Sequence, residues 1–410
     1  MPDQITLRTP TPDEFPRFVA PLSIAFNEEI SDAAIENDRK TIELDRFVGA
    51  FDGDQVVGCG GAYTFRLTVP GGEVGAAGVT AVGVLPSHRR RGILRQMMTW
   101  LFDQARERHE PLAILWASEA AIYQRFGYGP GTVSSAFEIA KDKIQFRRPV
   151  EAPGRFRLVD VDEATERFPA VYEVVRRSTP GTVNRTDARW RWEVLYDAPW
   201  YREGAGPKLR ALYEVDGEIR GYVIYRTKGD WDTSGPKGVV LVQELTALDP
   251  AAEQALWAWV GGIDLIASVR ARRAPLPHPL QLLLTEPRRL GLTVTDGSWI
   301  RIIDLAGALE ARSYASPGEL VLEVADAFCP ANHGRWRLSA ASGRATVRPA
   351  PDAEPDLTLD ISDVAATYLG AFRFTDLRRA GRVRECRAGA VAQADAMFRT
   401  EVAPLTSTMF

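Results

Sequence analysis

The stretch that decides the fold runs from Val79 to Leu94 and reads Val-Thr-Ala-Val-Gly-Val-Leu-Pro-Ser-His-Arg-Arg-Arg-Gly-Ile-Leu. Its first half is a β-branched run that predicts a strand, and Pro86 marks a turn. Three arginines and Gly92 then precede an apolar pattern with helical spacing. The members of that pattern are Ile93, Leu94, Met97, Met98, Leu101 and Phe102. The predicted order is therefore strand, basic glycine-containing loop, helix.

The start of this helix is suited to an anion. The first backbone N–H groups of a helix have no partner within it, and the helix dipole is positive at that end. Gly92 allows close approach to the backbone, and the arginine triplet of residues 89–91 adds positive charge. A phosphate group is the natural occupant. Taken alone, the loop is equally compatible with a solvated arginine cluster on a surface turn, whereas the short triplet disfavours a nucleic-acid or targeting patch.

Length and composition predict a globular protein of two or three domains. The chain has 410 residues, 45% of them hydrophobic, and a net charge of −4, which argues against general nucleic-acid binding. No basic leader with an apolar segment and no membrane-length apolar run is expected, so a cytoplasmic setting is the default. The cysteines and histidines show neither a disulfide framework nor metal-ligand spacing, and no metal is expected. These residues are Cys59, Cys329, Cys386, His88, His109, His278 and His333.

The elements around the opening stretch alternate between helix and strand signals. Thr11, Pro12 and Glu14 predict a helix start, and residues 46–60 predict a hairpin around Asp52-Gly-Asp. The remaining expected elements are a strand at 62–69, a buried strand at 112–117, a short helix at 121–130 and a strand at 133–139 that closes the sheet.

This order resembles the GCN5-related N-acetyltransferase (GNAT) superfamily. The pyrophosphate loop of that superfamily corresponds to Arg89-Arg-Arg-Gly-Ile-Leu94, with Leu94 departing from the usual Gly or Ala. Together with Ser118-Glu-Ala-Ala-Ile-Tyr-Gln-Arg-Phe-Gly-Tyr-Gly129, the loop is similar to the Eis ("enhanced intracellular survival") acetyltransferases. In those proteins a bulky aliphatic residue at the Leu94 position is usual. The resemblance implies a fold, an activity and a set of site residues.

Acetyl-CoA is the co-substrate that the resemblance implies. A splayed strand would form hydrogen bonds with the amides of the pantetheine arm. The backbone amides and positive charge of the loop would hold the pyrophosphate. Two further residues would border the acetyl end. The corresponding residues are Val82, Gly83 and Val84 on the strand, Arg90, Arg91, Gly92, Ile93, Leu94 and Arg95 at the loop, and Ser118 and Glu119 at the acetyl end.

Two residues match the catalytic positions of the resemblance. Tyr123 matches the general acid, and a phenol with a reference pKa of ~10 suits protonation of a thiolate. From the residues alone, Tyr123 is also compatible with a packed aromatic, and Tyr128, between two glycines, is expected to be structural. The carboxylate of the last residue, Phe410, matches the general base, which requires a desolvated pocket or a bridging water.

The residues expected at the acceptor-amine site are those that depart most from the family pattern. Phe26 and Glu28 match acceptor-pocket positions, although Glu28 is also compatible with an exposed helix-end carboxylate. Trp116 stands where histidine is familiar, and Met409 replaces an acidic residue before the final Phe. The precise amine is therefore left open.

Residues 151–298 repeat the pattern without its phosphate loop. The hairpin signal returns at 212–225 and the strand at 238–248, but Asp249, Pro250 and Glu253 replace the basic loop. Phosphate would meet negative charge there. Residues 299–410 resemble the sterol-carrier-like domain that ends Eis chains.

We therefore expect an α/β (α+β) protein with two tandem GNAT folds and a sterol-carrier-like domain. The expected divisions are 1–150 for the catalytic domain, 151–298 for the degenerate copy and 299–410 for the segment that supplies the C-terminal carboxylate. The expected activity is direct acetyl transfer from acetyl-CoA to primary amines, either aminoglycoside or polyamine-like molecules or lysine side chains. The resemblance also implies a homo-oligomer, a hexamer. A non-catalytic acyl-CoA-binding or lipid-binding regulatory protein is the alternative.

Overall fold

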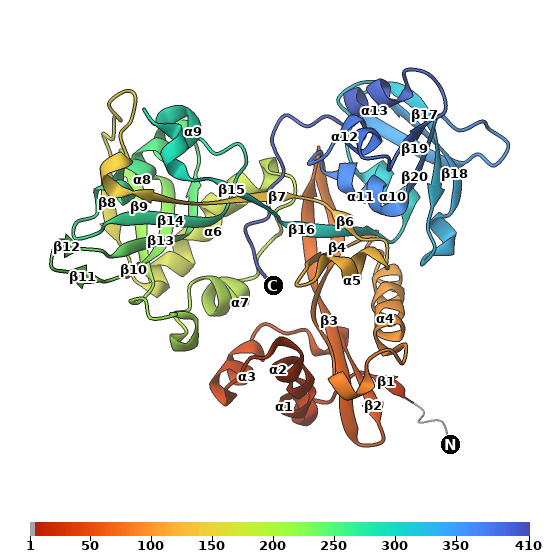
Figure 1. Ribbon diagram of the computed structural model, residues 1–410, viewed down its shortest axis with the longest axis horizontal. Helices are drawn as coiled ribbons and strands as arrows, with labels where there is room; N and C mark the ends of the chain where they lie inside the picture. Colours follow the sequence, from red (N-terminus) through yellow and green to blue (C-terminus); the bar gives the residue numbers. More distant parts are fainter. Residues whose placement is uncertain (1–4) are drawn as a thin grey trace. The chain divides into compact units, whose positions relative to one another are not determined.

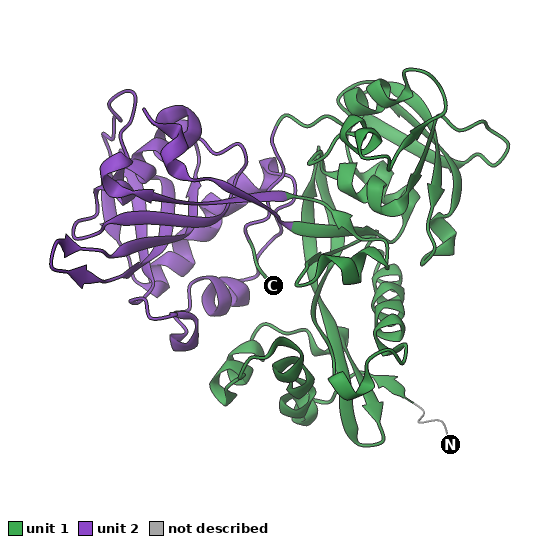
Figure 2. Cartoon of the chain, in the orientation of Figure 1, with its two compact units in different colours: residues 1–132, 298–401, 408–410 green, residues 133–297, 402–407 purple. Residues whose placement is uncertain are grey.

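The computed structural model describes residues 5–410, which form two compact units (Figures 1 and 2). One unit contains residues up to Thr132, Ser298–Glu401 and Thr408–Phe410, and the other contains Val133–Gly297 and Val402–Ser407. No helix within the described range is long and apolar enough to cross a membrane.

The first unit is built on a seven-stranded sheet. From one edge to the other its strands are β1 (Thr6–Arg8), β2 (Phe47–Asp52), β3 (Gln55–Val69), β4 (Gly72–Val84), β5 (Leu112–Trp116), β16 (Ser298–Ile302) and β6 (Gly129–Pro130). Its helices are α1 (Phe15–Phe18), α2 (Ala20–Phe26), α3 (Asp32–Asp38), α4 (Ile93–Glu107) and α5 (Ala120–Gln124). The expected helix after the arginines is therefore present, with the predicted apolar face buried except for the half-buried Leu94.

The remainder of the first unit is a smaller α+β layer. Its five-stranded sheet has the order β19 (Arg344–Pro349), β18 (Gly334–Ala341), β17 (Gly318–Ala325), β20 (Leu357–Asp360) and β21 (Arg384–Glu385). Its helices are α10 (Leu305–Ala311), α11 (Ile361–Tyr368), α12 (Phe374–Arg379) and α13 (Ala390–Phe398). Helix α11 packs on β16 and β6 of the larger sheet, so this layer adjoins the turn after α5.

The second unit repeats the sheet plan of the first. Its seven strands, in the matching order, are β8 (Arg155–Leu158), β9 (Leu209–Val215), β10 (Glu218–Lys228), β13 (Val239–Ala247), β14 (Ser268–Ala274), β7 (Val133–Ala140) and β15 (Thr293–Asp296). The pair β11 (Trp231–Asp232) and β12 (Gly235–Pro236) forms a separate ribbon. Its helices are α6 (Val161–Ser178), α7 (Asp187–Arg189), α8 (Pro250–Gly262) and α9 (Leu280–Leu283).

The sixth strand of each sheet comes from a part of the chain next to the other sheet's strands: β16 in the first sheet and β7 in the second. The expectation that residues 133–139 close the first sheet is wrong, because β7 pairs with β14 and β15 of the second sheet. Its place is taken by β16, which pairs with β5 and β6. The compact units accordingly divide at 132/133 and 297/298, whereas the sequence suggested 150/151 and 298/299. The strand pattern alone cannot reveal the exchange, since an alternating strand fits either sheet equally well.

Candidate active site

The centre of the first sheet is opened between β4 and β5. These parallel strands pair only from Ala76–Gly78 to Leu112–Ile114, and β4 then continues to Val84 without β5 beside it. A bulge in the pairing of β3 with β4 leaves Ala81 with a positive φ of 56°. The extra residue raises the local twist of β4. The splayed strand expected around Val82, Gly83 and Val84 is therefore present.

Gly83 brings an N-terminal helix close to this open strand. A Cβ at Gly83 would lie 3.2 Å from the Cβ of Ala25 and 3.5 Å from Cδ2 of Leu22, both on α2. Phe26 ends α2 with 42% of its surface exposed, and Glu28 follows it on the surface. Of the two predicted acceptor residues, Phe26 thus ends a helix that packs on the splayed strand, and Glu28 lies just beyond that helix.

The basic loop leads into α4 as the sequence predicts. Gly92 is the N-cap with a φ of +80°, no side chain caps the helix, and a Cβ there would meet no atom within 4 Å. The first-turn amides of Ile93, Leu94 and Arg95 therefore lack intrahelical partners. Such amides, reached through an open glycine, can bind phosphate oxygens.

The charges of the loop are arranged around Asp52. Nε2 of His88 lies 3.2 Å from Oδ2 of Asp52, and Nη1 of Arg91 lies 3.9 Å from the same oxygen. Arg90 has a left-handed backbone with φ of 64° and an exposed side chain, while the Arg95 guanidinium lies 4.8 Å from the centre of the Phe328 ring. All three arginines of residues 89–91 are exposed, so the triplet as a whole supplies the cationic charge near the helix start.

The C-terminal residue lies at the base of the opening. The Phe410 ring packs edge-on against Phe65 with centroids 4.9 Å apart, and its Cδ2 is 3.4 Å from a Cβ built at Gly78. Gly78 is the last β4 residue that pairs with β5. The last residue thus lies against the sheet where the strands separate. The contacts that Phe65 and Gly78 make with it have no sequence signal, because an aromatic and a glycine are ordinary in strand patterns.

Trp116 holds the tail in place. Trp116 is the last residue of β5. Its indole Nε1 donates a hydrogen bond to the Thr408 carbonyl, with 3.0 Å between the two atoms. Met409, between Thr408 and the last residue, is 60% exposed. The residue predicted to contact substrate is therefore also a support for the C-terminus.

Tyr123 occupies a buried position on the short helix α5. It is 6% exposed and belongs to the same apolar cluster as Val79 and Leu115, from β4 and β5. Burial raises the pKa of its phenol, and the Glu119 charge adds to the rise, while a hydrogen bond with Ser118 opposes it. The phenol is therefore protonated at neutral pH and can donate a proton. Ser118 and Glu119 themselves are exposed at the end of β5.

Tyr128 is the structural partner of Tyr123. It is fully buried, its ring packs edge-on against Tyr123 with centroids 5.8 Å apart, and its hydroxyl has no hydrogen-bond partner among residues 5–410. Among the same residues no cluster of three or more histidine, cysteine or acidic side chains is arranged to hold a metal ion.

A buried arginine lies inside the last segment of the first unit. Arg312 is 1% exposed and donates hydrogen bonds to the carbonyls of Thr367, Tyr368 and Phe398. Its guanidinium lies 4.5 Å from the Phe398 ring centre. An arginine held by helix-end carbonyls therefore lies in the core of this layer.

Comparison with known proteins identifies the three segments. Residues 6–131 and 181–302 each match a family described as acetyltransferase (GNAT) domain, and residues 305–407 match the sterol carrier protein domain. The expected fold class, two GNAT folds and a sterol-carrier-like domain, is confirmed.

Relatives and solved structures extend the match to the whole chain. The chain is 35% identical over 424 residues to N-acetyltransferase Eis of Mycobacterium tuberculosis, covering 99% of this chain and 100% of that one. It is 43% identical over 367 residues to an uncharacterized N-acetyltransferase of Streptomyces avermitilis, covering 88% of each. The crystal structure of Eis1 from Mycobacterium abscessus superposes with a TM-score of 0.84 at 32% identity, covering 99% of this chain and 100% of that one. The chain belongs to the Eis family of GNAT N-acetyltransferases.

Proposed function

We propose that this N-acetyltransferase moves the acetyl group of acetyl-CoA directly to a primary amine. GNAT acetyltransferases use acetyl-CoA. The observation that carries the proposal is the opening between β4 and β5, with Phe410 at its base and Tyr123 in the adjoining core. A thioester supplies an electrophilic carbonyl and a thiolate leaving group. The chain supplies the groups that bind it and move protons.

The binding roles follow from the backbone. The unpaired edge of β4 at Val82, Gly83 and Val84 can bond the amides of the pantetheine arm, as a further strand would. The α4 start at residues 92–95 and the exposed arginines suit the pyrophosphate. The Val82 amide is assigned to polarise the thioester carbonyl.

The proton transfers use two groups of opposite character. The Phe410 carboxylate, directly or through a water, accepts a proton from the substrate ammonium, and the resulting amine attacks the carbonyl carbon. The new C–N bond forms as the C–S bond breaks, and the Tyr123 phenol protonates the departing thiolate. The attacking nitrogen releases its second proton to solvent, and solvent reprotonates the Tyr123 phenoxide. No covalent acyl-enzyme is needed, and Cys59, the cysteine within the β3–β4 pairing, is fully buried with its thiol pKa raised to about 12 by that burial.

The acceptor is proposed to be a polyamine-like or aminoglycoside-like molecule or a lysine side chain. The supporting feature is the surface around the end of α2, where Phe26 offers an apolar face and Glu28 a carboxylate for a second ammonium. Trp116 and Met409 complete the proposed acceptor region. Operation in the cytoplasm and assembly as a homo-hexamer are part of the same proposal by family resemblance.

A thiol-release assay with acetyl-CoA tests the function. The panel contains a polyamine, an aminoglycoside, free lysine and a lysine-containing peptide. Wild type is compared with a variant lacking Phe410 and a variant with one alanine added after Phe410. The extension keeps the ring and moves the carboxylate, so both variants are expected to lose kcat. Unchanged turnover in both would contradict the role of the terminus, and acetyl-CoA binding without turnover of any amine would support the regulatory alternative.

A further inference from the structure

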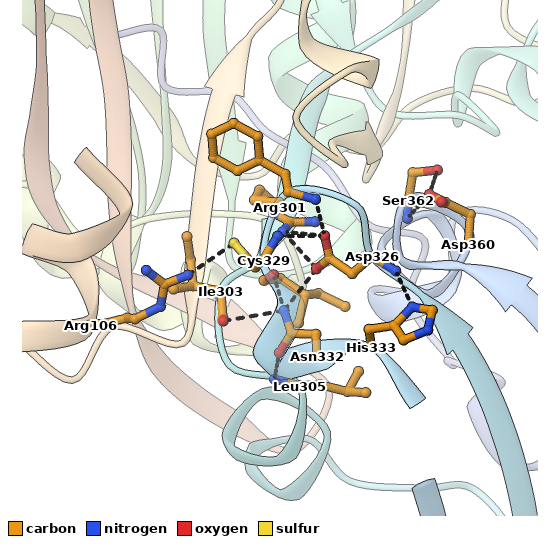
Figure 3. Close-up of polar contacts among 12 residues, drawn as sticks. Arg106, Arg301, Ile303, Leu305, Asp326, Cys329, Asn332, His333, Asp360 and Ser362 are labelled. Atoms are coloured by element: carbon orange, nitrogen blue, oxygen red, sulfur yellow. Dashed lines mark hydrogen bonds and ion pairs between the residues drawn. The ribbon is translucent and has the colours of Figure 1, made fainter. Parts of the chain in front are cut away.

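A buried ion pair lies behind the helix that carries Tyr123. Arg301, on β16, has no exposed surface, and its Nη2 donates to both carboxylate oxygens of Asp326 at 2.9 and 2.7 Å (Figure 3). The carboxylate also accepts from the backbone N–H groups of Phe328 and Cys329 and from Nδ2 of Asn332. Asp326 is therefore held by three further donors, and it holds the guanidinium in one orientation.

The other side of the guanidinium faces the turn after α5. Its Nη1 lies 1.9 Å from the position a Cβ would take at Gly127, where φ is +80°. Neither Nη1 nor Nε of Arg301 has a hydrogen-bond partner within residues 5–410. The guanidinium is thus bonded to the described part of the chain through Nη2 alone. The guanidinium instead packs against a residue that must lack a side chain.

The turn at Gly127 fixes the end of the Tyr123 helix. The Gly127 N–H donates to the Gln124 carbonyl at 2.9 Å, and the Tyr128 N–H donates to the Tyr123 carbonyl at 3.3 Å. The Tyr128 ring is the surface on which the Tyr123 ring packs. Arg301 is therefore connected to Tyr123 by its close approach to Gly127, by the peptide bond from Gly127 to Tyr128, and by the contact between the two tyrosine rings.

We propose that Arg301 is a positioning residue for Tyr123, acting through Gly127 and Tyr128, with Asp326 fixing its orientation. The inference rests on the proposed role of Tyr123 as the proton donor. A misplaced proton donor lowers the rate of transfer while leaving the binding of acetyl-CoA unchanged, and a displacement of about 1 Å can cost ~100-fold in rate.

The test compares Arg301→Met with a matched ion-pair variant in the same unit. Arg46 and Glu110 form a second buried pair, with side chains 1% and 5% exposed. Arg46 donates two hydrogen bonds to the Glu110 carboxylate, at 2.7 and 2.5 Å, and one to the Thr64 hydroxyl. Arg46→Met and Arg301→Met are both expected to lower the unfolding temperature. Only Arg301→Met is expected to lower kcat, by about 10- to 100-fold, with KM for acetyl-CoA within about twofold of wild type. The kcat is expressed per acetyl-CoA-binding site in the same sample, which removes any unfolded fraction.

Two further variants keep the test decisive if Arg301→Met folds poorly. Arg301→Lys retains a positive charge opposite Asp326 but lacks the planar group that lies on Gly127, so we expect a folded protein with an intermediate loss of kcat. In a Tyr123→Phe background, Arg301→Lys is expected to cause less than a twofold further loss, because the residue it positions is already gone.

The outcomes separate this inference from the proposed function. Loss of kcat in Tyr123→Phe with wild-type kcat in both Arg301 variants would overturn the positioning role alone. A full additive loss in the double variant, or an equal loss in Arg46→Met, would also overturn it. Wild-type kcat in Tyr123→Phe would remove the proton-donor role and this inference together.

Discussion

The β4–α4 and β13–α8 connections occupy the same place in two sheets of the same strand order, yet they are built differently. Both begin at a parallel pair that separates, since β13 pairs with β14 only from Val239–Val242 to Ser268–Ala271. In the first unit, the opening leads to Phe410 and an uncapped helix start. In the second, protein groups occupy both places.

A buried ion pair lies just beyond the paired part of β13 and β14. Glu244 lies two residues past the end of the β13–β14 pairing. Its carboxylate accepts hydrogen bonds from both terminal guanidinium nitrogens of Arg185, at 2.9 and 2.6 Å. The Arg185 charge also lies 4.0 Å from the Tyr172 ring centre. Glu244 thus carries an ion pair on the part of β13 that continues without β14, as β4 continues without β5.

The helix start of the second unit is satisfied internally. Asp249 caps α8 by accepting from the Ala252 N–H at 2.9 Å, and its other oxygen receives Arg220 at 2.5 Å. Pro250 removes one amide from the first turn. The two sheets therefore share one strand order, whereas an aspartate and a proline occupy the helix start that is uncapped in the first unit.

The helices that follow the fifth strand of each sheet, α5 and α9, also differ between the two units. α5 carries the buried Tyr123, whereas α9 carries Leu282, which is 76% exposed. Tyr123→Phe is expected to lower kcat by about 10²- to 10⁴-fold, or ~3–5 kcal/mol in barrier, while Leu282→Ala leaves kcat unchanged. Steady-state kinetics with both variants checks this difference, and equal kcat in Tyr123→Phe and wild type would contradict it.

The pH profile sharpens the same assignment. The acting form is the protonated phenol, which is present below its pKa, and burial raises that pKa above the usual ~10. Activity is therefore expected to persist through pH 9 and to fall only as pH rises through the raised value. A fall in kcat near pH 8 that disappears in Tyr123→Phe would contradict the buried, protonated phenol.

Arg185→Met removes the buried Arg185–Glu244 ion pair of the second unit. Removing one partner leaves the Glu244 carboxylate buried without its arginine, so the free energy of unfolding is expected to fall by about 3–5 kcal/mol. The KM for acetyl-CoA of the folded enzyme is expected to stay unchanged. Denaturant unfolding and steady-state kinetics measure the two effects, and a change in KM with no loss of stability would reverse the account of this site.

Arg90→Ala combined with Arg91→Ala removes charge at the working loop. We expect KM for acetyl-CoA to rise about 10- to 100-fold with kcat little changed, because exposed charge-assisted bonds to phosphate contribute to binding. The rise should shrink at high salt, which screens exposed charges. An unchanged KM at low salt would show that the loop does not hold the pyrophosphate.

Asp249→Ala is the corresponding change at the degenerate loop. Loss of an N-cap is expected to lower the free energy of unfolding by about 1 kcal/mol, with no effect on KM for acetyl-CoA. A thermal unfolding scan beside the kinetic assay measures both. A raised KM would mean that this loop, too, takes part in cofactor binding.

The sequence predicted local features better than distant ones. The α4 face, the loop order and the Tyr123 helix follow from spacing and from the family resemblance, because each is written in a short stretch of chain. The exchange of β7 and β16 was missed because strand alternation does not specify its partner sheet. The Trp116–Thr408 contact joins residues 292 positions apart and has no local signature.

The central claim is that the chain has one acetyl-CoA site, in the first unit. Calorimetric titration of the full chain with acetyl-CoA tests it most directly, using wild type, the Arg90→Ala/Arg91→Ala variant and Asp249→Ala. One site per chain is expected in wild type and Asp249→Ala, with strongly weakened binding in the arginine variant. Two sites per chain, or a single site weakened by Asp249→Ala and not by the arginine changes, would contradict the claim.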